Sequence, residues 1–182
     1  ILINMERAAE LISSFKQVAV DQSSETRRRF NLKGYINEIL LSLRPRYKKT
    51  GHTINVHCDE TIELNSYPGA FSQILNNLIM NSLIHGFEEM DSGRIEMEIS
   101  CSDNLVTFIY RDNGKGMTSE QKAKVFDPFY TTRRTKGGTG LGMSILFNLV
   151  TQTLNGSIDC QASEGAGVVF TMTFPISPAA DE

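Results

Sequence analysis

The chain has no tryptophan, only three cysteines and no apolar run that approaches the length of a membrane-spanning helix. The missing apolar run argues against membrane contact by this segment, and the N-terminal residues do not have the pattern of a signal peptide. Cys58, Cys101 and Cys160 lie far apart in strand-like stretches and lack the spacing of a metal site. We therefore expect reduced cysteines used as small core residues in a cytoplasmic protein, even if the full-length protein is membrane-anchored.

A strong net charge of one sign is also absent, because the sequence has 18 Lys and Arg residues and 21 Asp and Glu residues. This balance gives no support to general nucleic-acid binding. The 182 residues, of which 40% are hydrophobic, suffice for one well-buried domain with an appendage. Position 1 is Ile1 rather than methionine, so we expect a fragment of a longer protein or a processed chain.

Hydrophobic periodicity predicts the main elements. Apolar residues recur at intervals of three and four in the segments 4–29, 32–48 and 141–154, and in a segment that begins at Pro68 with Ser66 as its candidate cap. Alternation predicts strands at 54–58, 95–101, 106–110, 157–162 and 168–174, with a short extended piece at 62–64.

The segment between the predicted strand at 106–110 and the last helix contains a short helix and a long loop. Thr118 and Gln121 match a capping box that opens a helix to about Val125. Residues 126–138 have no clear periodicity, and such a loop in a compact domain is either functional or disordered. Hairpin-linked strands predict a mixed, mostly antiparallel sheet covered on one face by helices, which is an α+β, two-layer sandwich.

The helix that follows Pro68 carries polar side chains at regular spacing. Asn77, Asn81 and His85 are four residues apart, so they project from one side, whereas Ile79 and Ser82 project toward the expected sheet. An amide oxygen suits Mg²⁺, and an imidazole can donate to a phosphate. The alternative, a local hydrogen bond for the amide and a surface histidine, stays open for this helix alone.

Two glycine-containing segments follow. Asp112 opens the run Asp112-Asn113-Gly114-Lys115-Gly116 at a strand end, where a buried carboxylate can accept from an exocyclic amine such as that of adenine. Taken alone, this run is better explained as a plain turn. A second run enters the last predicted helix and suits phosphate binding, although it is neither a Walker A motif nor a dinucleotide fingerprint: Gly138-Thr139-Gly140-Leu141-Gly142.

Together these segments resemble the N, G1, F and G2 boxes of the catalytic ATP-binding domain of sensor histidine kinases, within the GHKL or Bergerat-fold ATPases. Residues 126–132, Phe-Asp-Pro-Phe-Tyr-Thr-Thr, resemble the F box, and residues 139–145 resemble the G2 box. The resemblance implies three parts: 1–29, similar to the second helix of the dimerisation and phosphoacceptor hairpin; 30–176, the catalytic domain; and 177–182, a tail.

The resemblance also implies ligands and roles. ATP and Mg²⁺ would bind, with Asn81 as metal ligand and Asn77 on the phosphate side, and Asp112 would read the adenine amino group. Residues 117–138 would form a mobile lid, with Phe126 and Phe129 as its anchors. The other implied nucleotide-binding residues are His85, Gly114, Gly116, Met117, Arg133, Lys136, Gly138, Thr139, Gly140, Leu141 and Gly142.

The sequence departs from the family pattern at three places. No histidine has the context of a phosphoacceptor box, so the acceptor hairpin is expected upstream. Asn77 stands where gyrase-like and chaperone-like relatives place a glutamate base, and an amide cannot activate water. Val168 stands where a threonine near the adenine is common.

The expected function is phosphoryl transfer from ATP to a histidine on that separate hairpin and then to a response regulator, by a protein that forms a homodimer when full-length. A different GHKL ATPase and a non-catalytic nucleotide-dependent interaction module are the alternatives.

Overall fold

The computed structural model describes residues 26–132 and 139–178. In chain order, the elements are β1 (Arg28–Asn31), α2 (Leu32–Tyr47), β2 (Thr53–Cys58), β3 (Glu63–Ser66), α3 (Pro68–Asn81), η1 (Ser82–Gly86), β4 (Arg94–Ser102), β5 (Leu105–Asp112), α4 (Ser119–Ala123), α5 (Gly142–Asn148), η3 (Leu149–Thr153), β6 (Ser157–Ala162) and β7 (Val168–Pro175).

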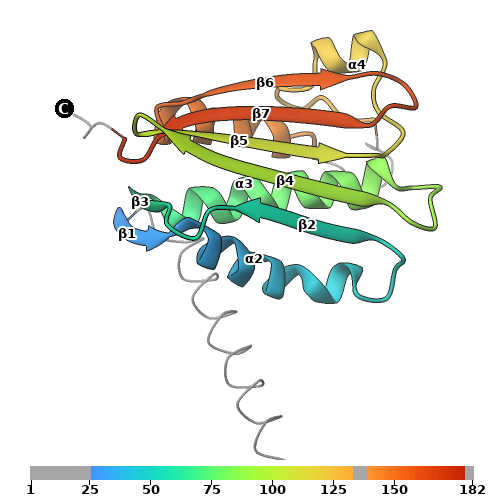
Figure 1. Cartoon of the computed structure of the whole chain (residues 1–182). Coiled ribbons are helices and arrows are strands. Elements are labelled where there is room, and N and C mark those ends of the chain that lie inside the picture. The colour runs from blue at the N-terminus through green and yellow to red at the C-terminus, as the bar shows by residue number, and fades with distance from the viewer. Residues whose placement is uncertain (1–25, 133–138, 179–182) are drawn as a thin grey trace, which may run out of the picture.

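One main sheet and one layer of helices make up the fold. The five strands lie in the order β2-β4-β5-β7-β6, with β2 and β4 parallel and the other neighbours antiparallel. Figure 1 shows α3 and the continuous helix of α5 and η3 behind this sheet, with α2 beside α3. The predicted α+β sandwich with a mixed, mostly antiparallel sheet is therefore confirmed.

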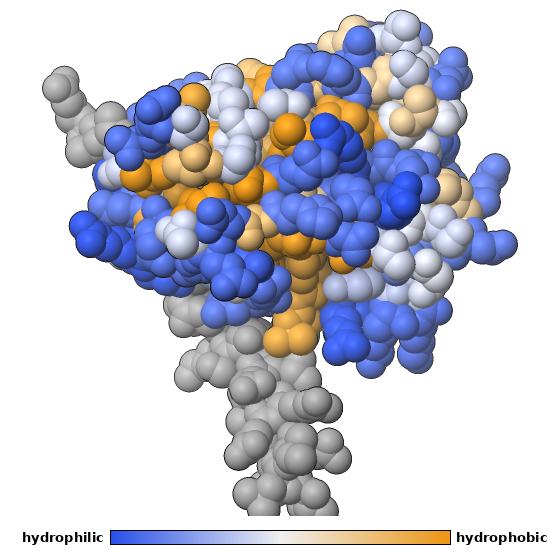
Figure 2. Space-filling view, in the orientation of Figure 1, coloured by the Kyte–Doolittle hydropathy of each residue, from blue (hydrophilic) through white to orange (hydrophobic). Residues whose placement is uncertain are grey.

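Alternation along the strands separates a buried face from an exposed one. In β5, the buried positions Val106, Phe108, Tyr110 and Asp112 point toward the helices. On the opposite face Arg111 forms an ion pair with Glu98 of β4 at 2.5 Å, and Figure 2 shows this face as mainly polar with apolar residues between. The strand period therefore carries Asp112 to the core side of the sheet, at the end of β5.

The first described strand corrects the predicted N-terminal helix. Residues 1–25 of that helix lie outside the described residues, but Arg28 and Arg29 belong to β1, which pairs antiparallel with β3. The prediction of a helix to Arg29 is therefore wrong at this end. The pairing holds Phe30 in the core against the rings of Tyr35 and Phe71, and this aromatic packing outweighs the local helical pattern.

Ser66 was expected to cap the helix at Pro68, and this expectation is also wrong. The cap position is Tyr67, which makes no side-chain cap bond, while Ser66 is the buried last residue of β3. Its hydroxyl has no hydrogen-bond partner among the described residues. By contrast, the capping box is confirmed, since Thr118 and Gln121 each accept from the other's backbone N–H.

Two helices end in widened turns. The helix α3 continues into the π-helical turn η1, in which the N–H of Phe87 donates to the carbonyl of Ser82 at 2.8 Å. The helix α5 continues into η3, so that the predicted helix over 141–154 is confirmed within a residue at each end. Because π-type turns occur often at functional sites, the η1 turn draws attention to the residues it carries.

Among the described residues, no helix is both long enough and apolar enough to cross a bilayer.

Candidate functional site

A cavity of about 540 Å³ lies between the end of α3, the end of β5 and the start of α5. Its wall brings together all three sequence motifs that were expected to form one site. The predicted site residues on this wall are Asn81, His85, Asp112, Gly116, Met117, Thr139, Gly140 and Gly142. The central expectation of a shared cavity is therefore met by the geometry.

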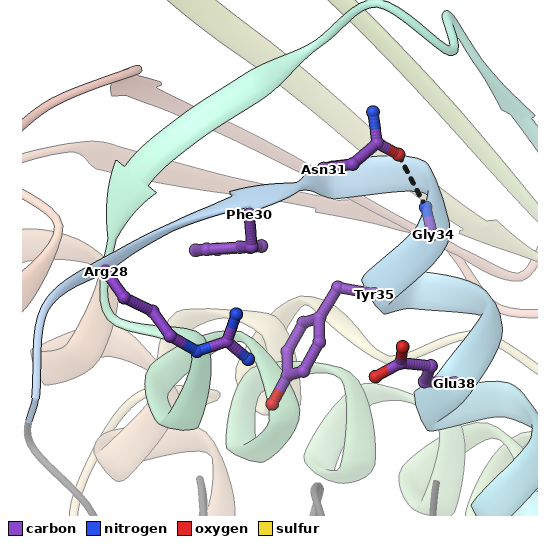
Figure 3. A pocket seen from close by; sticks show the side chains of 6 residues that line it. All are labelled: Arg28, Phe30, Asn31, Gly34, Tyr35 and Glu38. Atoms are coloured by element: carbon purple, nitrogen blue, oxygen red, sulfur yellow. Dashed lines mark hydrogen bonds between the residues drawn. The ribbon is translucent and has the colours of Figure 1, made fainter.

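A second cavity of similar volume, about 560 Å³, lies beside β1 and the first turns of α2. Figure 3 shows its lining, in which the Arg28 guanidinium lies 5.6 Å from the Phe30 ring centre and 5.7 Å from that of Tyr35. The Asn31 side chain accepts from the N–H of Gly34 and caps α2. No described residue of the amide, aspartate or glycine motifs lines this cavity, so chemistry rather than volume identifies the first one as the candidate site.

Asp112 is the buried carboxylate of the site. One oxygen, Oδ2, accepts from the Ser82 hydroxyl at 2.5 Å. The other, Oδ1, accepts from the backbone N–H groups of Gly114 at 3.0 Å and Val168 at 3.3 Å. These three donors fix the plane of the carboxylate, which also lines the cavity.

Ser82 and Tyr110 complete this corner, and neither was expected to belong to the site. The Tyr110 hydroxyl lies 2.8 Å from the Ser82 hydroxyl, and both side chains are buried. Burial raises the pKa of Tyr110 well above its ordinary value, and the nearby Asp112 charge adds to this rise. The sequence did contain one signal for Ser82, which is a serine on the otherwise apolar, sheet-facing side of its helix.

The glycine positions explain how the loops approach the cavity. Gly116 has a φ of +71°, and a Cβ there would clash with the Ser163 carbonyl of the β6–β7 loop. Gly140 has a φ of +69°, and a Cβ there would clash with the Phe129 backbone. Both positions therefore require glycine. Gly114 does not line the cavity but packs against the backbone of Gly86.

Asn77 has a different position from Asn81. Its side-chain N–H donates to the carbonyl of Gly142 at 2.9 Å, and it is not among the cavity-lining residues. The contact ties the helix that carries Asn81 to the first turn of α5. Leu141 also lies off the cavity wall, at the cap position of α5.

The two expected lid anchors behave differently. Phe126 packs at 5.2 Å from the ring centre of Phe147 and at 6.3 Å from that of Phe170. Phe129 has a side chain that is 63% exposed and a φ of +64°. Its expected role as an anchor stays a prediction. Its backbone lies against Gly140.

The cavity rim adds charged groups that the sequence did not single out. Lys115 and Glu88 both line the cavity and form an ion pair at 3.1 Å. Tyr130, Thr131 and Thr132 of the expected lid also reach the wall. The expected phosphate contacts Arg133, Lys136 and Gly138 lie outside the described residues.

Comparison with known proteins agrees with this geometry. Residues 67–178, more than half of the chain, match the family model described as "Histidine kinase-, DNA gyrase B-, and HSP90-like ATPase". The chain is 26% identical over 171 residues to the sensor histidine kinase RcsC of Salmonella typhimurium, covering 91% of this chain and 18% of that protein. It is 35% identical over 111 residues to the sensor histidine kinase ZraS of Klebsiella oxytoca, covering 60% of this chain and 23% of that protein. The chain thus spans only a small part of these relatives.

Solved structures extend the comparison to the fold. The catalytic domain of histidine kinase ThkA superposes with a TM-score of 0.73 at 27% identity, covering 84% of this chain and 99% of that domain. The structure of ThkA in complex with the response regulator protein TrrA matches in fold with a TM-score of 0.68 at 22% identity, covering 97% of this chain and 50% of that one. The chain therefore belongs to the histidine kinase-, DNA gyrase B- and HSP90-like ATPase family.

Proposed function

We propose that this chain is the catalytic domain of a sensor histidine kinase, which binds Mg-ATP and transfers the γ-phosphoryl group to a histidine on a separate helical hairpin. The observation that carries the proposal is the meeting of Asn81, Asp112 and Gly140 on one cavity wall. Phosphoryl transfer depends mainly on positioning and on neutralising charge, and this wall offers groups for both ends of a nucleoside triphosphate.

Different lining residues of the cavity suit different parts of the nucleotide. Asp112 is an acceptor for the adenine amino group, and the apolar side chains of Met117 and Val168 lie on the same wall as contacts for the base. Thr139, Gly140 and Gly142 also line the cavity, and their short side chains leave the backbone accessible to phosphate oxygens. Val168 has no hydroxyl, so its contribution to the base is its N–H bond to Asp112.

The residues present fit a magnesium ion that arrives with the nucleotide. The described residues contain no group of three His, Cys, Asp or Glu side chains able to hold a metal. Mg²⁺ does not need one, because it keeps several waters and takes phosphate oxygens as ligands. The Asn81 amide oxygen would hold it at the cavity wall, and the bound ion would neutralise charge on the phosphates.

The carboxylates of the cavity favour a kinase over an efficient hydrolase. Two carboxylates, Glu88 and Asp112, line the cavity within the described residues. Asp112 accepts three hydrogen bonds and Glu88 pairs with Lys115. Asn77 is an amide bonded to Gly142 and cannot act as a base. We therefore infer slow water attack and transfer to an external histidine.

The wider assignment follows from the same proposal. We place the start of the catalytic domain at β1 rather than at residue 30, because Arg28 already pairs with Ser66 of β3. The preceding residues would then belong to the second helix of the acceptor hairpin, and residues 177–182 to a tail. A cytoplasmic homodimer that passes the phosphoryl group to a response regulator would complete the pathway.

Asn81→Ala tests the metal role. We expect this variant to lose the Mg²⁺-dependent part of its ATP affinity, since it removes the proposed protein ligand. Calorimetric titration with ATP, in the presence of Mg²⁺ and of a chelator, measures that part. Asn148→Ala, an exposed asparagine of α5 away from the cavity, is the matched control. Full Mg²⁺ dependence in Asn81→Ala would contradict the proposal.

Transfer to a separately produced acceptor hairpin tests the activity itself. The chain is expected to bind ATP, to hydrolyse it slowly when alone, and to label the hairpin on histidine when γ-labelled ATP is added. Steady hydrolysis that does not depend on the hairpin would favour another ATPase of the family. Nucleotide binding without any transfer would favour a non-catalytic interaction module.

A further inference from the structure

A chain of three polar groups runs beneath the cavity from the core to the carboxylate. The Tyr110 hydroxyl lies 2.8 Å from the Ser82 hydroxyl, which lies 2.5 Å from Oδ2 of Asp112. All three side chains are buried. They come from two elements, since Tyr110 and Asp112 share the inward face of β5 and Ser82 begins the widened turn η1.

The two hydrogen bonds that link Tyr110, Ser82 and Asp112 each have a fixed donor and a fixed acceptor. Asp112 accepts at both oxygens: two backbone N–H groups donate to Oδ1, and the Ser82 hydroxyl donates to Oδ2. Ser82 has one hydroxyl hydrogen, which it donates to Oδ2. The Ser82 oxygen can then only accept, so Tyr110 donates to it. Burial, which raises the pKa of Tyr110, keeps that donor proton in place.

Counting hydrogen bonds also shows how many acceptor sites of Asp112 remain for a ligand. A carboxylate has about four acceptor sites, and the described structure fills three of them with the hydroxyl of Ser82 and the N–H groups of Gly114 and Val168. The remaining capacity is on a residue that lines the cavity. It is suited to one N–H donor of a ligand and unsuited to a carbonyl oxygen.

We propose that Ser82 and Tyr110 are positioning residues that orient Asp112 as a single acceptor, so that the cavity selects a 6-aminopurine over a purine lacking the amino group. The inference rests on the proposed ATP function and deepens it. Ser82 acts directly on Asp112, whereas Tyr110 acts through Ser82. Loss of the serine hydroxyl should therefore cost more than loss of the tyrosine hydroxyl.

The experiment compares two nucleotides across matched variants. Calorimetry measures the affinity of the chain for ATP and for purine riboside triphosphate, which lacks the amino group. We expect Ser82→Ala to weaken ATP binding by about tenfold or more, as for loss of a hydrogen bond to a charged group, with little change for the analogue. Tyr110→Phe should lower the preference for ATP in the same direction but by less.

Ser66→Ala is the control, because Ser66 is equally buried and its hydroxyl has no partner among the residues described. This variant is expected to keep the full preference for ATP. Thermal melts of each variant show whether the fold is retained. If Ser82→Ala does not fold, Tyr110→Phe carries the test, because it removes one oxygen and keeps the ring.

The possible outcomes separate the two proposals. If the wild-type chain prefers ATP and both variants keep that preference in full, or lose affinity equally for both nucleotides, the positioning role is overturned while the ATP site stands. If the wild-type chain binds both nucleotides equally, adenine readout by Asp112 fails, and the positioning role fails with it. A selective loss for ATP supports the inference.

Discussion

At the scale of single residues, Asp112 is the carboxylate on which three hydrogen bonds of the site converge. Its two oxygens accept from Ser82, from the N–H of Gly114 and from the N–H of Val168. An asparagine of the same shape would present N–H groups where these donors lie. The carboxylate is therefore needed both by the loop that carries it and by a ligand amine.

Asp112→Asn is expected to weaken ATP binding by at least about tenfold, because hydrogen bonds to charged groups contribute roughly 1.5–3 kcal/mol. Calorimetric titration of the variant measures the loss. Asp103→Asn, at the exposed turn between β4 and β5, is the control and should bind normally. An unchanged affinity in Asp112→Asn would contradict the assignment of the cavity.

The residue-scale predictions from sequence succeeded where spacing was enough. The four-residue interval placed Asn81 and His85 on one wall of the cavity. It could not distinguish Asn77, whose amide turns to Gly142, 65 residues further along the chain. Nor could it pair Ser82 with Asp112, because that contact depends on how α3 lies across β5.

At the scale of elements, periodicity predicted the long helices and strands but not the places where tertiary packing decides. The segment Arg28–Asn31 became a strand because β3 offers it an antiparallel partner. Phe129 is mostly exposed, and its backbone lies against Gly140. Neither outcome has a local signal, since both depend on residues distant in sequence.

The strands also determine the reactivity of the cysteines. Cys58 lies in β2 and Cys160 in β6, the two edge strands, and both side chains are partly buried against the core. Burial raises the pKa of Cys58 to about 11 and that of Cys160 to about 12. Cys101 lies exposed near the end of β4. The three thiols therefore differ in access, and burial disfavours the thiolate of Cys58 and of Cys160.

With an aromatic disulfide reagent at about pH 8, we expect one thiol to react quickly and two slowly, because the thiolate is the nucleophile. The fast thiol is Cys101, and Cys101→Ser should remove the fast phase. Cys58→Ser should leave that phase intact. Fast reaction of all three thiols in the folded chain would contradict the inward packing of β2 and β6.

At the scale of the whole molecule, the sequence predicted a mixed sheet under one layer of helices but not the strand order. The sheet pairs β2 parallel with β4 and has β5 at its centre, and α2 and α3 are buried against one face of it. That arrangement puts Tyr110 at the centre of the core, next to the site. Core stability and the ligand site therefore share a titratable group.

The shared group predicts how stability depends on pH. Burial raises the pKa of Tyr110 above its ordinary value of about 10, so the unfolded chain loses this proton at a lower pH than the folded chain. Stability from this group is then fully present below about pH 10 and falls as pH rises further. The thiols of Cys58 and Cys160, whose pKa values are raised from 9.0 to about 11 and about 12, act with the same sign from about pH 9 upward.

Urea unfolding at a series of pH values between about 8 and about 10.5 measures this dependence, and the free energy of unfolding should fall across the upper part of that range. Tyr110→Phe lowers stability at neutral pH through its lost hydroxyl bond to Ser82, so the comparison uses the slope with pH. That slope should be shallower in Tyr110→Phe and shallower again when Cys58 and Cys160 are also replaced by serine. A flat profile in the wild-type chain, or an unchanged slope in Tyr110→Phe, would contradict the raised pKa of Tyr110 and the burial that causes it.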